Sequence, residues 1–489
     1  MPTIWGRLIH LDSIFRCHYE WAMEVLTRSG SASLWVYGTI PWEEQYMASG
    51  LLSEYWTRIQ RLTVIVDASL FLGEMDPDTF SYGEGIIQYW EVFQRPAPQL
   101  EVFTMQYNES SSSVTSINPK TVCLFNNDAP VLKELAIVGM KYAQSGLWIS
   151  KLRSLTLTHL FQIPQIFTIL SSIRLLESLK IVGTSSKEGI YLDLPILKLP
   201  KLTQLSLSGN YWVILPLIDR IIPQAGCSLH LFLETMKRWT FNPADITMLE
   251  REHLELIQRK ATEYLQRYLL AHPATRLSID VQDEYVHLSD LSHTVGQDSA
   301  FTIDGVFNKD SGPSIIEQIS RHEYLSNVNK MSLHLNVTPP HSSCLSGLPS
   351  SLRSLSELET SENTLKYLIN QESRADGVFP VLRTLKLTHL YPAKSQSRNI
   401  WNFLKQQIGG GSPITVLDFT LLPYHLLYDM EYLDSIPGLT MVKWLLPGTG
   451  LVQYECGSGK PTNLCFKNTS KTKQQRVDFE EEVDEWYRY

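Results

Sequence analysis

The feature of this sequence that most restricts its fold is a short apolar pattern that recurs along the chain. In each copy, two arbitrary residues separate the first apolar residue from the second, and one separates the second from the third. The copies begin at Leu100, Leu132, Leu152, Leu176, Leu202 and Leu382, with an earlier, degenerate copy at Ile59. Residues 152–161 (LRSLTLTHLF) and 382–391 (LRTLKLTHLY) are identical at seven of ten positions. Such self-similarity indicates a fold built from repeated units.

The spacing and periodicity of these units predict their structure. The copies that begin between residues 100 and 202 start 20 to 32 residues apart, and leucine-rich repeats run about 20–29 residues. The alternating core of each copy suits a short strand with one buried face, and residues 163–173 and 214–222 have apolar residues at helical spacing. We therefore expect an α/β fold: an irregular leucine-rich-repeat-like solenoid, with a curved parallel sheet and helices on its convex side.

The repeat pattern weakens between residues 228 and 380, but helix and strand signals still alternate there and beyond. The predicted helices cover residues 246–270, 311–326 and 401–408, and the predicted strands cover residues 276–280, 331–335 and 414–419. Residues 284–312 are polar with several glycines and aspartates, so we expect a long loop or insertion. A run of three glycines at residues 409–411 should end the preceding helix.

Three segments follow from these patterns. Residues 1–45, with a helix over residues 14–28, are expected to be an N-terminal helical cap, and residues 46–466 carry the repeats. Residues 467–489, where basic residues precede a run of acidic ones, are expected to be a charged, disordered tail. Because stacked repeats grow in one dimension, we expect the length of 489 residues to reflect the number of repeats rather than several independent cores. The inward-facing strand positions of the repeats explain the excess of leucine, which supplies 69 of the residues.

Charge, apolar runs and cysteines disfavour several classes of partner. The net charge of −9 disfavours nucleic acid and anionic membranes. The longest apolar run, residues 211–218, is far shorter than the roughly 20 residues of a transmembrane helix, and the first residues lack the apolar core of a secretory signal. The six cysteines are scattered without zinc-ligand spacing. We expect an intracellular protein, cytoplasmic or nuclear, with no nucleic acid or membrane partner.

Sequence patterns typical of catalysis fail at decisive positions. Residues 456–461 (CGSGKP) are similar to a phosphate-binding loop, but that loop needs glycine where Tyr454 stands and serine or threonine where Pro461 stands. His322 begins a zinc-protease pattern whose second histidine position holds Ser326. No Gly-x-Ser-x-Gly nucleophile motif occurs. We predict that the chain is not an enzyme, with no catalytic residue, cofactor or metal ligand, and that residues 456–461 form a turn.

The polar positions between the strand leucines are the candidate binding residues. The leucines of each unit point into the core, so the intervening side chains lie on the open, concave surface of the sheet. Small and hydroxyl-bearing residues dominate there, with a few lysines, and such a surface can bind a protein. The candidate partner-binding residues are Glu134, Val138, Ser154, Thr156, Thr158, Lys180, Gln204, Ser206, Thr384, Lys386 and Thr388, with Ala136, Ser178 and Ser208 beside them.

Four short segments carry a resemblance to a known family. They are residues 5–12 (WGRLIHLD), 24–36 (EVLTRSGSASLWV), 129–135 (APVLKEL) and 454–459 (YECGSG). Together they resemble the large F-box and leucine-rich-repeat family of mushroom-forming fungi, over roughly residues 5–465. In that family, residues such as 24–36 follow the F-box, and residues such as 129–135 begin one of the degenerate repeats.

The resemblance implies a function. In that family an F-box binds a Skp-type adaptor of a cullin ubiquitin ligase, and the repeats choose the substrate. This sequence contains no Leu-Pro-x-Asp/Glu opening, so we expect the adaptor and the cullin as partners only if an F-box lies upstream. We therefore expect a protein-protein interaction module: the substrate-recognition repeats of a ubiquitin-ligase receptor, which bind an unidentified client protein.

Two alternatives remain open. The first is a stand-alone repeat scaffold, or a truncated paralogue, without ligase recruitment. The second is a hydrolase or transferase whose site lies in residues 284–312.

Overall fold

The computed structural model describes most of the chain and divides it into two compact units. The described residues are 2–7, 9–16, 19–67, 91–108, 122–143, 146–184, 194–233, 248–282, 285–292, 300–306, 311–320, 323–336, 347–369, 379–388, 398–422, 430–444 and 450–460. Unit 1 comprises Met1–Ala271 with Ile303–Gly305, and unit 2 comprises His272–Thr302 with Val306–Tyr489. Each unit is an α/β structure with a mostly parallel sheet.

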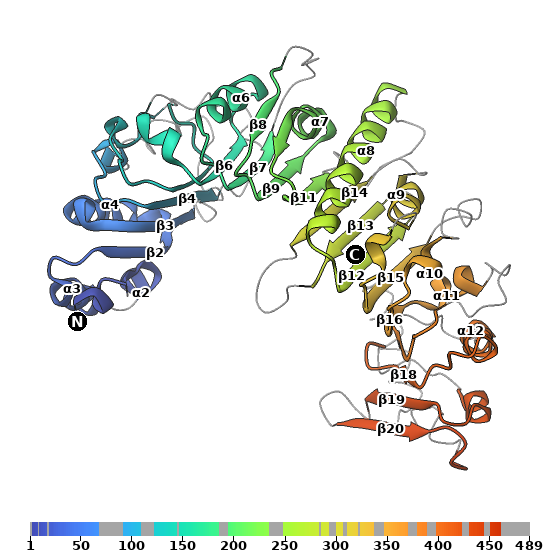
Figure 1. Ribbon diagram of the computed structural model, residues 1–489. Coiled ribbons are helices and arrows are strands. Elements are labelled where there is room, and N and C mark those ends of the chain that lie inside the picture. Colours follow the sequence, from blue (N-terminus) through green and yellow to red (C-terminus); the bar gives the residue numbers. More distant parts are fainter. Residues whose placement is uncertain are drawn as a thin grey trace, which may run out of the picture. The chain divides into compact units, whose positions relative to one another are not determined.

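Unit 1 alternates strands with α-helices and short 3-10 helices (Figure 1). Its strands are β1 (Ile9–His10), β2 (Leu34–Pro41), β3 (Ile59–Asp67), β4 (Val102–Asn108), β5 (Glu134–Val138), β6 (Ser154–His159), β7 (Ser178–Thr184), β8 (Leu197–Leu199), β9 (Gln204–Gly209), β10 (Ile221–Pro223) and β11 (Ser228–Leu233). Its α-helices are α1 (Pro2–Trp5), α2 (Leu11–Arg16), α3 (Tyr19–Ser29), α4 (Gln45–Tyr55), α6 (Ile163–Ser172), α7 (Tyr211–Arg220) and α8 (Met248–Ala271). Its 3-10 helices are η1 (Trp42–Glu44), η2 (Trp56–Arg58), η4 (Glu91–Gln94), η5 (Leu124–Asn127) and η6 (Leu147–Lys151).

The sheet of unit 1 is parallel and follows chain order. Strands β1, β2, β3, β4, β5, β6, β7, β9 and β11 each pair with the next, and β8 pairs separately with β10. Their apolar residues stand in one register, and every member of this row is at most 1% exposed: Leu62, Phe103, Leu135, Leu155, Leu179, Leu205 and Leu229. The recurring apolar pattern therefore marks the inward-facing positions of consecutive strands, as predicted.

A repeated backbone hydrogen-bond motif precedes these strands. The carbonyl oxygen of Lys133 accepts hydrogen bonds from the N–H groups of Arg153 and Ser154, at 2.7 and 3.1 Å. In unit 2 the carbonyl of Asn329 accepts from Ser356 and Glu357 in the same way, at 2.9 and 3.0 Å. This motif satisfies the backbone N–H donors at the start of each strand and joins each repeat to the next one.

An aromatic row fills the core of unit 1 beside the 3-10 helices η2, η4, η5 and η6. Its members are Trp56, Phe93, Phe103, Phe125 and Trp148, all at most 4% exposed. Ring centroids of successive members lie 5.0 to 5.8 Å apart. Aromatic pairs at this distance pack favourably edge to face. These bulky rings supply much of the apolar burial in this part of unit 1.

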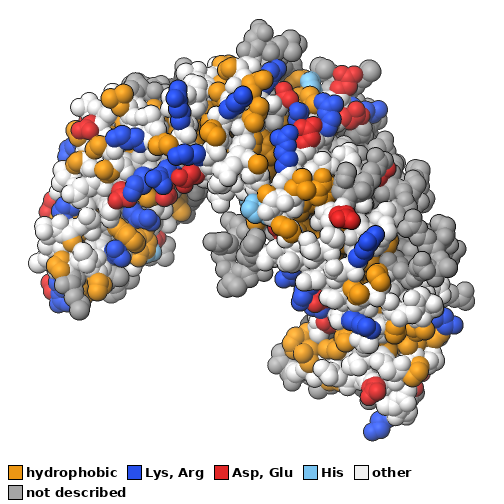
Figure 2. All heavy atoms as spheres, viewed as in Figure 1, with side chains coloured by type: hydrophobic (Ala, Val, Ile, Leu, Met, Phe, Trp, Pro, Cys, Tyr) orange, Lys and Arg blue, Asp and Glu red, His pale blue; other side chains and the backbone are white. Residues whose placement is uncertain are grey.

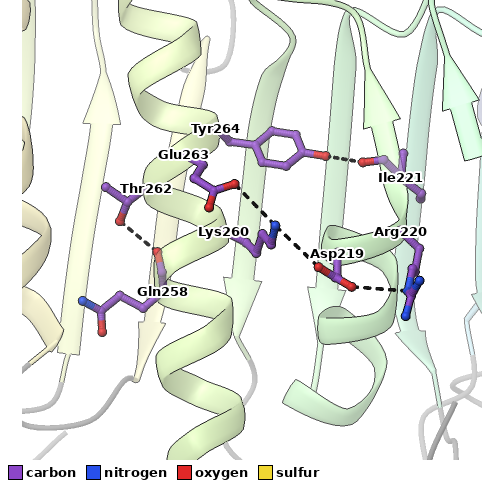
Figure 3. Close-up of polar contacts among 8 residues, drawn as sticks. All are labelled: Asp219, Arg220, Ile221, Gln258, Lys260, Thr262, Glu263 and Tyr264. Carbon is purple, nitrogen blue, oxygen red and sulfur yellow. Dashed lines mark hydrogen bonds and ion pairs between the residues drawn. The ribbon is translucent and has the colours of Figure 1, made fainter. Parts of the chain in front are cut away.

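Helices α7 and α8 of unit 1 pack together through polar contacts as well as apolar ones (Figure 3). The hydroxyl of Tyr264 on α8 donates to the carbonyl oxygen of Ile221, at 2.8 Å. Lys260 on α8 lies 3.5 Å from Oδ1 of Asp219 on α7 and 3.4 Å from Oε2 of Glu263. These contacts fix the long helix α8 beside the end of α7.

Unit 2 has the same alternation of strand and helix. Its strands are β12 (Arg276–Gln282), β13 (Tyr285–Asp290), β15 (Lys330–Asn336), β16 (Glu357–Thr360), β17 (Thr384–Leu387), β18 (Val416–Asp418), β19 (Thr440–Trp444) and β20 (Leu451–Glu455). Strand β14 (Phe301–Val306) is divided between the units, because its central residues Ile303–Gly305 belong to unit 1. The helices of unit 2 are α9 (Ser311–Ser320), η8 (Glu323–Leu325), α10 (Leu348–Ser351), α11 (Glu362–Ile369), α12 (Arg398–Gly409) and η10 (Glu431–Ser435). Strands β12, β15, β16, β17, β18 and β19 are parallel and in chain order, while β13 and β20 pair antiparallel with β12 and β19.

The helices lie on one side of each sheet. In unit 1, α4, α6 and α7 lie on one side of the strands, and in unit 2, α9, α11 and α12 do so (Figure 1). The buried row of unit 2 consists of Leu277, Met331, Leu358, Leu385, Leu417 and Met441. One face of each sheet is therefore apolar, and the other carries the alternate, more polar positions.

Most sequence-based elements are confirmed. The predicted helices over residues 163–173, 246–270 and 401–408 correspond to α6, α8 and α12, and the predicted strands over 276–280, 331–335 and 414–419 correspond to β12, β15 and β18. Gly411, in the triple glycine after α12, adopts a left-handed φ of +76°, which explains why that helix stops there. The predicted tail, residues 467–489, lies outside the described residues.

The predicted loop over residues 284–312 is wrong. It contains β13 and β14, and α9 begins at its end. Val286 and Leu288 of β13 are at most 2% exposed, as are Phe301 and Ile303 of β14. Each strand is short, so its two-residue apolar alternation was hidden by the surrounding polar and glycine-rich composition.

Several predicted helix boundaries are also corrected. The helix predicted over residues 14–28 is two helices, α2 and α3, and residues 1–45 also contribute strands β1 and β2 to the sheet. The helix predicted over 311–326 ends at Ser320, and that over 214–222 spans Tyr211–Arg220. The side chain of Asn210 accepts a hydrogen bond from the N–H of Val213 at 3.2 Å, so this cap starts α7 earlier than apolar spacing alone suggests. Among the described residues, no helix combines the length and the apolar character needed to cross a membrane.

Candidate functional site

The open face of the unit 1 sheet carries polar side chains in register from strand to strand. One row, across β5, β6, β7 and β9, consists of Glu134, Ser154, Ser178 and Gln204. The next row consists of Ala136, Thr156, Lys180 and Ser206. The structure thus brings together candidate residues that lie as many as 72 positions apart in the chain. Parallel strands lie about 4.8 Å apart, so neighbouring members of a row can contact one ligand.

Most candidate residues of unit 1 are accessible. Glu134, Lys180 and Gln204 are exposed, and the candidates that are half-buried are Ala136, Val138, Ser154, Thr156, Ser178, Ser206 and Ser208. Thr158 is the exception and a correction: it is 1% exposed, and its hydroxyl has no hydrogen-bond partner among the described residues. The register between β6 and β7 shifts just after Thr158, so the regular alternation of faces ends there.

The three downstream candidates, Thr384, Lys386 and Thr388, lie in unit 2. Thr384 and Lys386 are half-buried on the open face of β17. Thr388 follows β17, and its hydroxyl donates to the carbonyl oxygen of Thr360 at 3.2 Å. Thr388 therefore caps the neighbouring strand β16.

Charged side chains on the open face of unit 2 neutralise one another. Glu357 lies 2.7 Å from Nζ of Lys386 and 2.9 Å from Nζ of Lys330. Burial opposes ionisation of the Glu357 carboxyl, but the two lysines outweigh it, and its pKa falls below the ordinary value. The hydrogen bond to Glu357 raises the pKa of Lys386, which also lies 3.9 Å from Asp418. Because these charges are matched, this ladder stabilises the sheet and leaves little unsatisfied charge for a ligand.

An aromatic and basic cluster on the open face of β2 and β3 was not predicted from the sequence. The guanidinium carbons of Arg7 and Arg61 lie 4.3 and 4.7 Å from the ring centroid of Trp35. Tyr37, two residues further along β2, is 38% exposed and packs edge-on against His10, with ring centroids 4.8 Å apart. The alternation of Leu34, Trp35 and Val36 would have placed Trp35 on this face, but β2 lacks the recurring apolar pattern.

A polar ladder at the strand starts lies next to this cluster. Nε1 of Trp35 donates to Gln60 at 3.0 Å, Gln60 donates to Glu101 at 2.7 Å, and Lys133 lies 2.6 Å from the same carboxylate. The hydrogen bonds from Lys133 and Gln60 lower the pKa of Glu101. Figure 2 shows basic and acidic side chains beside one another on the viewed face of unit 1.

A small cavity of about 230 Å³ lies below α8 in unit 1. Its lining is Pro223, Gln224, Ala225, Gly226, Cys227, Tyr264 and Arg267. Burial raises the pKa of the Cys227 thiol to about 12 and also raises that of the Tyr264 hydroxyl, which is already hydrogen-bonded to Ile221. Neither group is poised for proton transfer at neutral pH, so this cavity is a gap in packing.

The glycine-rich segment after β20 is a turn in its described part, residues 456–460, as predicted. Oδ1 of Asp434 accepts hydrogen bonds from the hydroxyl of Tyr454 and the N–H of Gly457, both at 2.7 Å. These two hydrogen bonds lower the pKa of Asp434. Gly457 and Gly459 adopt left-handed φ values of +84° and +83°, which favour glycine. A carboxylate held against the turn would repel a phosphate, which argues against a phosphate-binding loop.

Comparisons with known proteins identify no family for this chain. No protein-family model matches the chain, and a search of curated proteins finds no match. Within the described ranges, no group of three or more histidine, cysteine, aspartate or glutamate residues is arranged to hold a metal ion.

Proposed function

We propose that the chain is a leucine-rich-repeat-like solenoid whose open sheet face in unit 1 binds another protein. The observation that carries the proposal is the register of β5, β6, β7 and β9. These strands bury one row of leucines and expose parallel rows of polar side chains on the opposite face. A regular array of this kind is the usual binding surface of stacked-repeat proteins.

The chemistry of the rows suits protein recognition. Serine and threonine hydroxyls and the Gln204 amide can both donate and accept hydrogen bonds, so they can pair with backbone groups of a partner. Lys180 and Glu134 add one charge of each sign at exposed positions. The other face of the sheet is covered, since α4 contacts β2, α7 contacts β9 and α8 contacts β11. The open face is therefore the side on which a partner reaches several repeats at once, and we propose binding rather than catalysis there.

Affinity capture with the tagged full-length chain tests the proposal. The open-face variant carries Thr156→Arg and Ser206→Arg, and the matched control carries Thr168→Arg on the solvent side of α6, where Thr168 is exposed. We expect a protein that the wild type and the control capture equally and that the open-face variant loses. Capture of the same proteins by all three chains would refute the proposal.

The resemblance to F-box and leucine-rich-repeat proteins extends the proposal to an intracellular substrate receptor of a cullin ubiquitin ligase. Co-expression with a Skp-type adaptor separates this role from a stand-alone repeat scaffold. Co-purification of the adaptor with the chain supports the receptor. A reproducible client without the adaptor supports the scaffold.

A further inference from the structure

We propose that the N-terminal end of the unit 1 open face binds an acidic segment of the protein partner, through two carboxylates spaced two residues apart. The binding residues are Arg7 and Arg61, stacked on Trp35. This inference rests on the proposed function, because it names the chemistry that the same face would recognise.

The position of both arginines is fixed by the strands. Trp35 and Arg61 are register partners in β2 and β3; Trp35 stands between the buried Leu34 and Val36, and Arg61 precedes the buried Leu62. Arg7 follows a turn that is held by a hydrogen bond from the N–H of Trp35 to the carbonyl oxygen of Gly6, at 2.8 Å. A Cβ at Gly6 would lie 2.5 Å from the carbonyl oxygen of Ser33. Only glycine lets this turn approach closely enough to bring Arg7 onto the indole.

The two guanidinium groups keep their hydrogen-bond donors available. Stacking on an indole uses the flat face of a guanidinium and leaves its in-plane N–H groups free for bidentate pairing with a carboxylate. Neither Arg7 nor Arg61 forms an ion pair with any described residue. Glu101, which attracts Arg61 electrostatically, is already engaged by Lys133 at 2.6 Å and Gln60 at 2.7 Å.

Arg7 and Arg61 differ from the lysines on the open face of unit 2 in having no counterion among the described residues. On the open face of unit 2, Lys330 and Lys386 share the carboxylate of Glu357, so the structure supplies their counterion. Arg7 and Arg61 have no such counterion among the described residues, although the whole chain carries a net charge of −9. Charge complementarity therefore favours an acidic ligand at this end of the face.

The geometry also limits the spacing of the ligand's charges. Both guanidinium carbons lie within 5 Å of one ring centroid, so their separation cannot exceed the sum of the two distances. In an extended peptide, residues i and i+2 point to the same side and lie roughly 6.5–7 Å apart. An Asp/Glu-x-Asp/Glu segment can thus give one carboxylate to each arginine. The exposed ring of Tyr37 adds aromatic surface beside them.

Fluorescence anisotropy with the full chain tests this inference. The probe is a labelled peptide of about twelve residues with Glu-Ser-Glu at its centre, compared at low salt with the same peptide carrying Gln-Ser-Gln. We expect the Glu peptide to bind at least about ten-fold more tightly. Arg7→Gln and Arg61→Gln should each weaken its binding by about ten-fold.

Arg153→Gln is the matched control, because Arg153 is an exposed arginine of unit 1 that already pairs with Glu177 at 3.4 Å. We expect it to leave peptide binding unchanged, and thermal unfolding verifies that each variant is folded. Equal binding of the two peptides, wild-type binding by both Arg7→Gln and Arg61→Gln, or an equal loss in Arg153→Gln would each overturn the inference. If it fails while the Thr156→Arg, Ser206→Arg variant still loses a captured partner, the proposed function stands without this acidic specificity.

Discussion

The Nζ atom of Lys386 lies 2.7 Å from Oε1 of Glu357, which comes from the neighbouring strand of unit 2. The other carboxylate oxygen of Glu357 lies 2.9 Å from Nζ of Lys330, on the strand beyond. One half-buried carboxylate thus links three parallel strands. Charged residues of the open face can therefore stabilise the sheet itself.

Glu357→Gln should lower the free energy of unfolding by about 1 kcal/mol at neutral pH, because it removes the carboxylate that Lys330 and Lys386 share and leaves Lys386 with only the more distant Asp418, at 3.9 Å. The matched control is Glu177→Gln, whose partner Arg153 is 58% exposed, and we expect a change near zero. Urea denaturation measures both. Equal effects of the two substitutions would show that the Glu357 ladder does not stabilise unit 2.

The same carboxylate predicts how stability depends on pH. The pKa of Glu357 is lower in the folded chain than the ordinary value of 4.5. Its contribution is therefore fully present above about pH 4.5 and is lost as the pH falls through the lower, folded pKa. The stability difference between wild type and Glu357→Gln should be constant near neutral pH and shrink below pH 4.5. A difference that persists unchanged into strong acid would contradict this assignment.

Gly139 should tolerate alanine less well than Gly411 does. Both glycines have left-handed φ values, +88° and +76°, so alanine strains each of them by about 1 kcal/mol. A Cβ at Gly139 would also lie 2.8 Å from Cβ of Tyr107, whereas a Cβ at Gly411 meets nothing within 4 Å. We expect Gly139→Ala to cost at least about 1 kcal/mol more in thermal unfolding. Equal losses would mean that β4 can move away from this turn.

The described cysteines should differ in reactivity. Cys227 and Cys456 are buried free thiols whose pKa values rise to about 12 and about 11, chiefly because burial disfavours the thiolate. Cys123 is a half-buried free thiol. In the native chain, iodoacetamide should alkylate Cys123 before Cys227 and Cys456, as mass spectrometry of the peptides would show. Prior alkylation of Cys227 would indicate that the segment below α8 opens readily.

The repeat pattern was enough to predict a parallel sheet with one buried face but not what fills the core behind it. Leu135 and Leu155 hold the same place in consecutive copies of the pattern, and the structure pairs them as neighbours in parallel strands. The aromatic row that includes Phe93 and Phe125 has no fixed spacing in the chain, so periodicity could not reveal it.

The candidate site was predictable only in part, for a similar reason. Thr156 and Lys180 belong to repeated units, so their position on the open face follows from the repeat. Arg7 is brought to Trp35 by a glycine turn, and Arg61 by strand pairing across 26 residues, a relationship with no local pattern. The prediction that Thr158 lies on the open face was wrong because a shift in register ends the regular alternation of faces at the end of β6.

Site-specific photo-cross-linking reports whether a partner contacts the open sheet face, because the covalent bond forms only at the residue that carries the photoreactive group. A photoreactive amino acid replaces Thr156 on the open face of β6 or, in the matched chain, Thr168 on the helix side of unit 1. If the open sheet face binds the partner, we expect a defined cross-linked partner from position 156 and none from position 168. A partner cross-linked from position 168 but not from position 156 would contradict the claim that the open sheet face is the binding surface.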